Sequence, residues 1–122
     1  MATILCVADS NRRLTYLGAT AKKLGYRVAT AVAPDHAVAL CVSRPEDIVA
    51  IVMDEDLIID GWSVADSLKM VAPKIPILLV CDKGAGSSPP PKGVDLVTKE
   101  GSRHAIMEGL KALLQRSASA SA

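Results

Sequence analysis

The sequence predicts an α/β fold in which a five-stranded parallel sheet lies between two layers of helices. Two observations predict it: short apolar runs rich in β-branched residues recur along the chain, and segments with helical spacing separate them. Alternating strands and helices favour a parallel sheet with right-handed crossovers. The length of 122 residues fits one domain. We expect this domain to span residues 1–116, with a flexible Ser/Ala tail at 117–122.

The five apolar runs are the predicted strands. Runs of this length, bounded by turn residues, are typical of strands that are buried on both faces. They cover residues 3–7, 27–32, 48–53, 75–80 and 94–98. The core must come from aliphatic side chains and methionine, because the chain has one tryptophan, two tyrosines and no phenylalanine.

Four segments have the spacing of helices. Ser10 or Asn11 can cap the first helix, which should end at Gly25, and Pro34 suits the first turn of the second. The third is expected to begin near Trp62. The apolar positions, helix by helix, are Leu14, Leu17, Ala21 and Leu24; Ala37, Leu40 and Cys41; Trp62, Ala65 and Leu68; and Ile106, Leu110, Leu113 and Leu114.

The connection after the fourth strand differs from the others. Residues 81–93 contain two glycines before Pro89, then three consecutive prolines and a further glycine, which disfavour a helix of ordinary length. We therefore expect a loop there, and a fourth helix that is shortened or absent.

Composition excludes several classes of function. Fourteen basic and thirteen acidic residues give a net charge of +1, which provides no electrostatic footprint for nucleic acid or an anionic membrane. No apolar run approaches the roughly 18 residues of a spanning helix. The three cysteines have no metal-ligand spacing, so we expect buried, reduced thiols and a cytoplasmic location.

Acidic residues gather where the predicted strands end. The carboxyl ends of parallel strands share one edge of the sheet, where ligands bind in such folds. The charged residues expected there are Asp9, Asp54, Glu55, Asp56, Asp82, Lys99 and Glu100. Crowded carboxylates repel one another unless a cation neutralises them. On this view, replacing Asp54 with Asn should leave the fold intact and stabilise it.

Three stretches, taken in order and spacing, resemble the receiver domain of two-component response regulators (CheY-like). They are residues 30–40, residues 45–54, and residues 60–62 followed by 73–79, and the resemblance extends over residues 3–114. It implies a flavodoxin-like three-layer sandwich with strand order 2-1-3-4-5. It also implies signalling proteins as partners, either a histidine kinase or a downstream target, and no enzymatic activity of the chain's own.

The resemblance also assigns roles by position. Asp54 falls on the aspartate that accepts a phosphoryl group, and Lys99 on the lysine that binds phosphoryl oxygens or the carboxylate. The Mg²⁺ ligands fall on Asp9, Asp54 and the backbone carbonyl of Asp56. The position of the second metal acid is Ala8, and that of the phosphoryl-binding hydroxyl is Cys81.

Departures from the family pattern predict a divergent or pseudo-receiver. Ala8 should weaken Mg²⁺ binding, and the Cys81 thiol is a poor donor. Asp82 stands where a small residue is usual, and it can block the pocket, pair with Lys99 or replace a metal ligand. In the fifth strand, Leu96 replaces the aromatic residue by which family members couple the phosphoryl site to the protein surface. We therefore expect weak or no Mg²⁺-dependent phosphorylation, and a function carried by protein–protein interaction.

Two alternatives stay open. Asp54 can be a competent phosphoacceptor that takes its phosphoryl group from a histidine kinase. Alternatively, the chain is a small flavodoxin-like enzyme that binds an anion or a nucleotide, because Arg12 and Arg13 lie at a predicted helix N-terminus. The simpler interpretation of these two arginines is a solvated helix face. A nucleophilic role for Cys81 is disfavoured because no histidine can be placed beside it.

Overall fold

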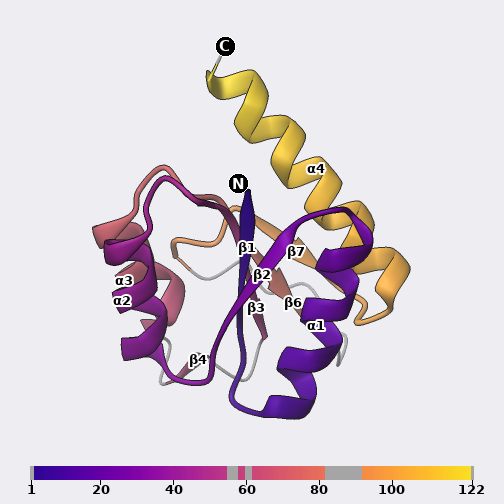
Figure 1. Ribbon diagram of the computed structural model, residues 1–122, viewed down its shortest axis with the longest axis horizontal. Coiled ribbons are helices and arrows are strands. Elements are labelled where there is room, and N and C mark those ends of the chain that lie inside the picture. Colours follow the sequence, from indigo (N-terminus) through magenta and orange to yellow (C-terminus); the bar gives the residue numbers. More distant parts are fainter. Residues whose placement is uncertain (1, 55–57, 60–61, 82–91, 122) are drawn as a thin grey trace.

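The computed structural model describes residues 2–54, 58–59, 62–81 and 92–121, with the backbone alone for residues 58–59, 62–63 and 117–121 (Figure 1). Five parallel strands form its main sheet in the order β2-β1-β3-β6-β7. The strands are β1 (Thr3–Val7), β2 (Arg27–Ala31), β3 (Ile48–Asp54), β6 (Ile77–Val80) and β7 (Leu96–Thr98). The predicted parallel sheet and its order are confirmed.

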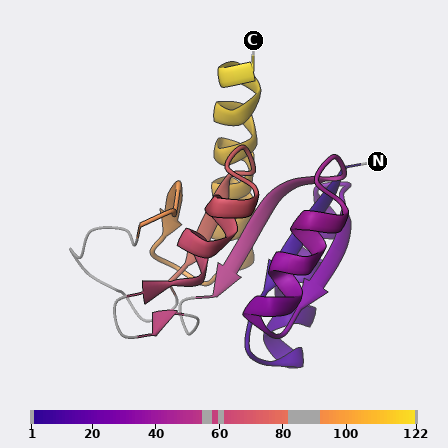
Figure 2. The ribbon, with the colours of Figure 1, turned by 90° about the vertical axis from the view of Figure 1, so that its left-hand side faces the viewer.

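Helices cover both faces of this sheet. In the described part of the chain, α1 (Asn11–Lys23) and α4 (Arg103–Ser121) pack on one face, and α2 (Pro34–Ser43) and α3 (Val64–Val71) on the other (Figures 1 and 2). Side chains alternate along a strand, so β1 contributes to two separate cores. Leu5 belongs to the core under α2 and α3, and Ile4 to the core under α1 and α4. The predicted three-layer sandwich is confirmed.

The ends of α1 follow from local capping. Ser10 precedes the helix with an extended backbone, and its hydroxyl accepts a hydrogen bond from the backbone N–H of Arg13 at 3.3 Å. At the other end Gly25 has a φ of +89°, the left-handed conformation that favours glycine after a helix. Both predicted ends of this helix are therefore confirmed, with Ser10 as the cap.

Two strands begin two residues later than predicted, for identifiable reasons. The run at 75–80 forms β6 only from Ile77, and the run at 94–98 forms β7 only from Leu96. Pro76 has no backbone N–H to donate to a neighbouring strand. The Asp95 carboxylate (Oδ2) accepts the N–H of Ile77 at 2.8 Å, so a side chain replaces the strand partner at this end of the sheet.

The third helix begins later than predicted. Trp62 is not in a helix but in β5 (Trp62–Ser63), which pairs in antiparallel fashion with β4 (Ile58–Ile59), and α3 starts at Val64. β-Branched and aromatic residues favour an extended backbone, and the helical spacing of apolar residues does not report this preference. The predicted loop after the fourth strand falls largely on residues 82–91, outside the described residues, so the shortened or absent helix stays a prediction.

The last helix is longer than predicted. Its backbone continues through residues 117–121, where the sequence predicts a flexible tail, and its final turns extend past the sheet (Figures 1 and 2). Alanine is the strongest helix former and accounts for this continuation. Flexibility of these residues stays a prediction. No helix in the described residues is both long enough and apolar enough to cross a membrane.

The three cysteines are buried thiols, as predicted. Burial disfavours the charged thiolate and raises the pKa of Cys6 to about 12. The pKa of Cys41 is raised for the same reason. Since the thiolate is the reactive form, Cys6 and Cys41 are held in their unreactive state near neutral pH.

Candidate functional site

The carboxyl ends of the strands bring the predicted site residues to one edge of the sheet. Asp54 is the last residue of β3 and pairs with Val80 of β6, and Val80 pairs in turn with Thr98 of β7. Cys81 therefore follows the strand beside Asp54, and Lys99 follows the next strand. Asp9 follows β1 on the other side of β3. The predicted convergence at one edge of the sheet is confirmed for these four residues.

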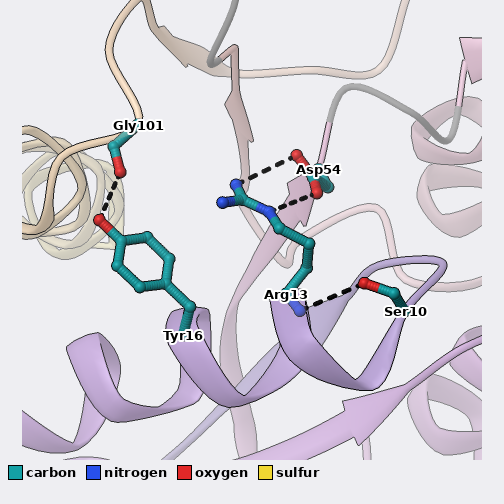
Figure 3. Close-up of polar contacts among 5 residues, drawn as sticks. All are labelled: Ser10, Arg13, Tyr16, Asp54 and Gly101. Carbon is teal, nitrogen blue, oxygen red and sulfur yellow. Dashed lines mark hydrogen bonds and ion pairs between the residues drawn. The ribbon is translucent and has the colours of Figure 1, made fainter.

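Asp54 lies at the centre of this edge and is only 2% exposed. Both of its carboxylate oxygens accept hydrogen bonds from the guanidinium of Arg13 (Figure 3). The Nε–H of Arg13 donates to Oδ2 at 2.8 Å, and Nη2 donates to Oδ1 at 3.3 Å. Two-point contacts of this kind are among the stronger hydrogen-bonded ion pairs in proteins, because the planar guanidinium matches a carboxylate.

The start of α1 directs Arg13 toward this contact. Ser10 holds the first turn by accepting the Arg13 N–H, and side chains in a helix lean toward its N-terminus. The guanidinium therefore reaches over the carboxyl edge of the sheet, and the Arg13 side chain is only 23% exposed. The expectation of a solvated helix face is wrong for Arg13, because a buried carboxylate draws it inward. It holds for Arg12, which is exposed.

Tyr16 lies one helical turn further along α1 and supports the same arrangement. The centre of the Arg13 guanidinium is 5.3 Å from the ring centroid, within the range of a cation–π contact. The Tyr16 hydroxyl donates a hydrogen bond of 2.5 Å to the backbone carbonyl of Gly101 (Figure 3). Arg103, in the first turn of α4, lies 5.6 Å from the same ring. Tyr16 thus connects Arg13 to the segment that joins Lys99 to α4.

We expect replacement of Tyr16 with Phe to lower the free energy of unfolding by about 1 kcal/mol, because the Gly101 carbonyl loses its donor while both ring contacts remain. Tyr26 is the matched control, since its hydroxyl makes no hydrogen bond to the described part of the chain. Urea denaturation of both Tyr→Phe variants measures the difference. Equal losses at the two positions would contradict a role for the Tyr16 hydroxyl.

The other predicted site residues divide into three groups. Asp9 and Lys99 are exposed, and neither forms an ion pair within the described residues. Arg13, not Lys99, is therefore the observed basic partner of Asp54, and a role of Lys99 toward phosphoryl oxygens stays a prediction. Cys81 is buried at the predicted position, and its N–H donates to the carbonyl of Thr98 at 2.9 Å. Asp56 and the predicted pocket blocker Asp82 lie outside the described residues.

The sequence contains one signal for the buried contact of Arg13. The first turn of α1 carries two arginines and no acidic residue. Cations are disfavoured at a helix N-terminus, where the helix dipole is positive. Two adjacent arginines there indicate a nearby anion, and Asp54 is that anion for Arg13.

The residues present do not fit a bound Mg²⁺ while Arg13 keeps this position. Mg²⁺ requires oxygen ligands in near-octahedral geometry, commonly one or two carboxylates with water. Here both oxygens of Asp54 accept guanidinium hydrogen bonds, and Ala8 is buried with no side-chain oxygen to offer. Across residues 2–54, 58–59, 62–81 and 92–121, no three acidic, histidine or cysteine side chains cluster in a way that could hold a metal ion.

No protein-family model and no curated protein matches the sequence of this chain. Solved structures do match its fold. A response regulator receiver domain protein from Clostridium thermocellum has a TM-score of 0.75 at 14% identity, with 95% of this chain and 96% of that chain covered. The chemotaxis protein CheY4 of Vibrio cholerae has a TM-score of 0.73 at 21% identity, with coverage of 93% and 99%.

A third match is the N-terminal domain of a three-domain response regulator/sensory box/GGDEF protein from Carboxydothermus hydrogenoformans. Its TM-score is 0.74 at 18% identity, and 98% of this chain and 99% of that chain are covered. The chain therefore has the CheY-like receiver fold over nearly its whole length.

Proposed function

We propose that this chain with a receiver fold is a two-component signalling module that acts by binding another signalling protein, independently of Mg²⁺-dependent phosphorylation. The observation that carries the proposal is the ion pair of Asp54 with Arg13. The partner is a histidine kinase or a downstream target, and the chain has no catalytic activity of its own. The module works in the cytoplasm, in keeping with its three buried free thiols.

The physical argument concerns the nucleophile. A carboxylate that attacks a phosphoryl group must offer an oxygen in line with the leaving group, and nearby cations must compensate the charge of the incoming anion. Both oxygens of Asp54 are engaged by Arg13, and the residue is almost completely buried. Attack would require Arg13 to withdraw, and the buried carboxylate would then lose its hydrogen-bonded cation.

The test is phosphoryl transfer to the wild-type chain. The purified protein is incubated with acetyl phosphate and MgCl₂, and its intact mass is measured, with Asp54→Asn as the control. We expect the wild type and the control each to keep its own unmodified mass. A phosphorylated species that forms in the wild type and is lost in Asp54→Asn would contradict the proposal, and would favour a competent phosphoacceptor.

A further inference from the structure

We propose that Arg13 is a built-in replacement for the divalent cation at Asp54, and that removing its charge opens Asp54 to Mg²⁺. The inference rests on the proposed function and identifies the residue that prevents Mg²⁺ from binding at Asp54. On this view Arg13 balances the charge of Asp54 and holds its carboxylate in place, and it takes part in no catalytic step. The site also has a latent affinity for a divalent cation that the intact chain suppresses.

The first step in the argument is the charge at Asp54. The carboxylate is 2% exposed, and a buried carboxylate needs a cation together with hydrogen bonds to remain ionised. A metal ion could meet this need, but Ala8 removes the second carboxylate that the resemblance assigns to the metal site. The Arg13 guanidinium supplies a positive charge and two donors directed at the two oxygens.

The second step is that Arg13 is held in place from three sides. Its backbone N–H donates to Ser10, its guanidinium donates to Asp54, and the Tyr16 ring lies 5.3 Å from the guanidinium. Tyr16 is itself tied to Gly101 through its hydroxyl. Figure 3 shows the hydrogen bonds of Arg13 to Ser10 and Asp54, and that of Tyr16 to Gly101. The Tyr16 ring limits the conformations of the guanidinium independently of the ion pair, which lowers the side-chain entropy that pairing with Asp54 costs.

The third step is that Arg13 and Mg²⁺ exclude each other. Both would bind the same two carboxylate oxygens, and a divalent cation on Asp54 would lie beside a like charge. Removing the positive charge of Arg13 therefore does two things at once. It frees the oxygens of Asp54 and removes the repulsion that a metal ion would meet.

The experiment is a Mg²⁺ titration of the full chain by isothermal titration calorimetry, with MgCl₂ alone as the probe. The variants are Arg13→Ala and Arg13→Gln, and Arg12→Ala is the matched control because it removes the same charge from an exposed neighbour. We expect both Arg13 variants to bind Mg²⁺ at least about tenfold more tightly than the wild type and Arg12→Ala. A thermal shift with Mg²⁺ relative to EDTA should follow the same order.

Equal Mg²⁺ affinity in the wild type and in both Arg13 variants would overturn the inference. A gain that persists when Asp54→Asn is added to Arg13→Gln would also overturn it, because the metal would then bind elsewhere. Arg13→Gln keeps a donor for Asp54 and protects against loss of folding. If both variants are unfolded in EDTA, recovery of helical circular dichroism with Mg²⁺ supports the inference, and no recovery contradicts it.

This outcome is separable from the proposed function. Phosphorylation of wild-type Asp54 would contradict the proposed function whatever the Arg13 variants do. Failure of the Arg13 variants to gain Mg²⁺ affinity, with the wild type inert to acetyl phosphate, would contradict this inference alone.

Discussion

Arg13→Ala is expected to lower the free energy of unfolding by about 3 kcal/mol when it is measured by urea denaturation in EDTA. Removing one partner of a buried ion pair leaves the other charge buried without that partner, and losses of this size are typical. Asp54 is that remaining charge, at 2% exposure. EDTA is needed because a divalent cation could otherwise take the place of the guanidinium.

A double-mutant cycle shows whether this loss belongs to the pair. Asp54→Asn should also destabilise, by about 1–2 kcal/mol, because the amide keeps one acceptor but loses the charge. The double variant should lose clearly less than the sum of the two single losses, because the interaction between the two side chains is counted in both single losses but is lost only once. Arg12→Ala should stay within about 0.5 kcal/mol of the wild type, as exposed substitutions usually do. A loss in Arg13→Ala no larger than in Arg12→Ala would contradict the argument.

Gly93→Ala is expected to be the second severe substitution, with a loss of about 3 kcal/mol. Gly93 has a φ of +92°, a conformation that costs other L-residues about 1 kcal/mol or more. An added Cβ would also come within 2.8 Å of the carbonyl carbon of Ala65 and 2.9 Å of the Asp66 nitrogen. Both are backbone atoms of the first turn of α3, which cannot move aside as a flexible side chain can, and overpacking of this kind costs about 1–3 kcal/mol.

Gly25→Ala is the matched control for this prediction. Gly25 has nearly the same φ, +89°, but a Cβ there would meet no atom within 4 Å. It should therefore lose about 1 kcal/mol from backbone strain alone. Thermal or urea denaturation of the two variants separates the cost of close packing from the cost of conformation. Equal losses would show that the contact of Gly93 with α3 contributes nothing.

The sheet could be predicted from the sequence because its signals are local. Buried parallel strands appear as continuous β-branched runs, and Pro34 and Gly25 mark helix ends whatever surrounds them. The start of the third helix was wrong because Trp62 fits a helical spacing and an extended strand equally well, and its pairing with Ile59 decides between them. Such pairing is a contact between strands, which spacing along the chain does not report.

The candidate site could be predicted only in part, for a similar reason. Asp54 was placed correctly because its position depends on the end of a strand. Its partner was missed because Arg13 lies 41 positions away, and the contact depends on where a long side chain turns. The expected gain in stability from Asp54→Asn assumed carboxylates repelling one another. With Arg13 bound to Asp54, the expected sign of that change is reversed.

The ion pair at Asp54 has a consequence for how information could pass through this chain. Its cation is covalently part of the protein, so it cannot diffuse away when the cellular concentration of Mg²⁺ changes. Under the proposed function, the chain is therefore able to bind its partner as soon as it has folded. No phosphate donor is needed to produce this state, and no phosphatase can reverse it. The extent of partner binding would then depend on the concentration of this protein in the cell, and the signal would last until the protein is degraded.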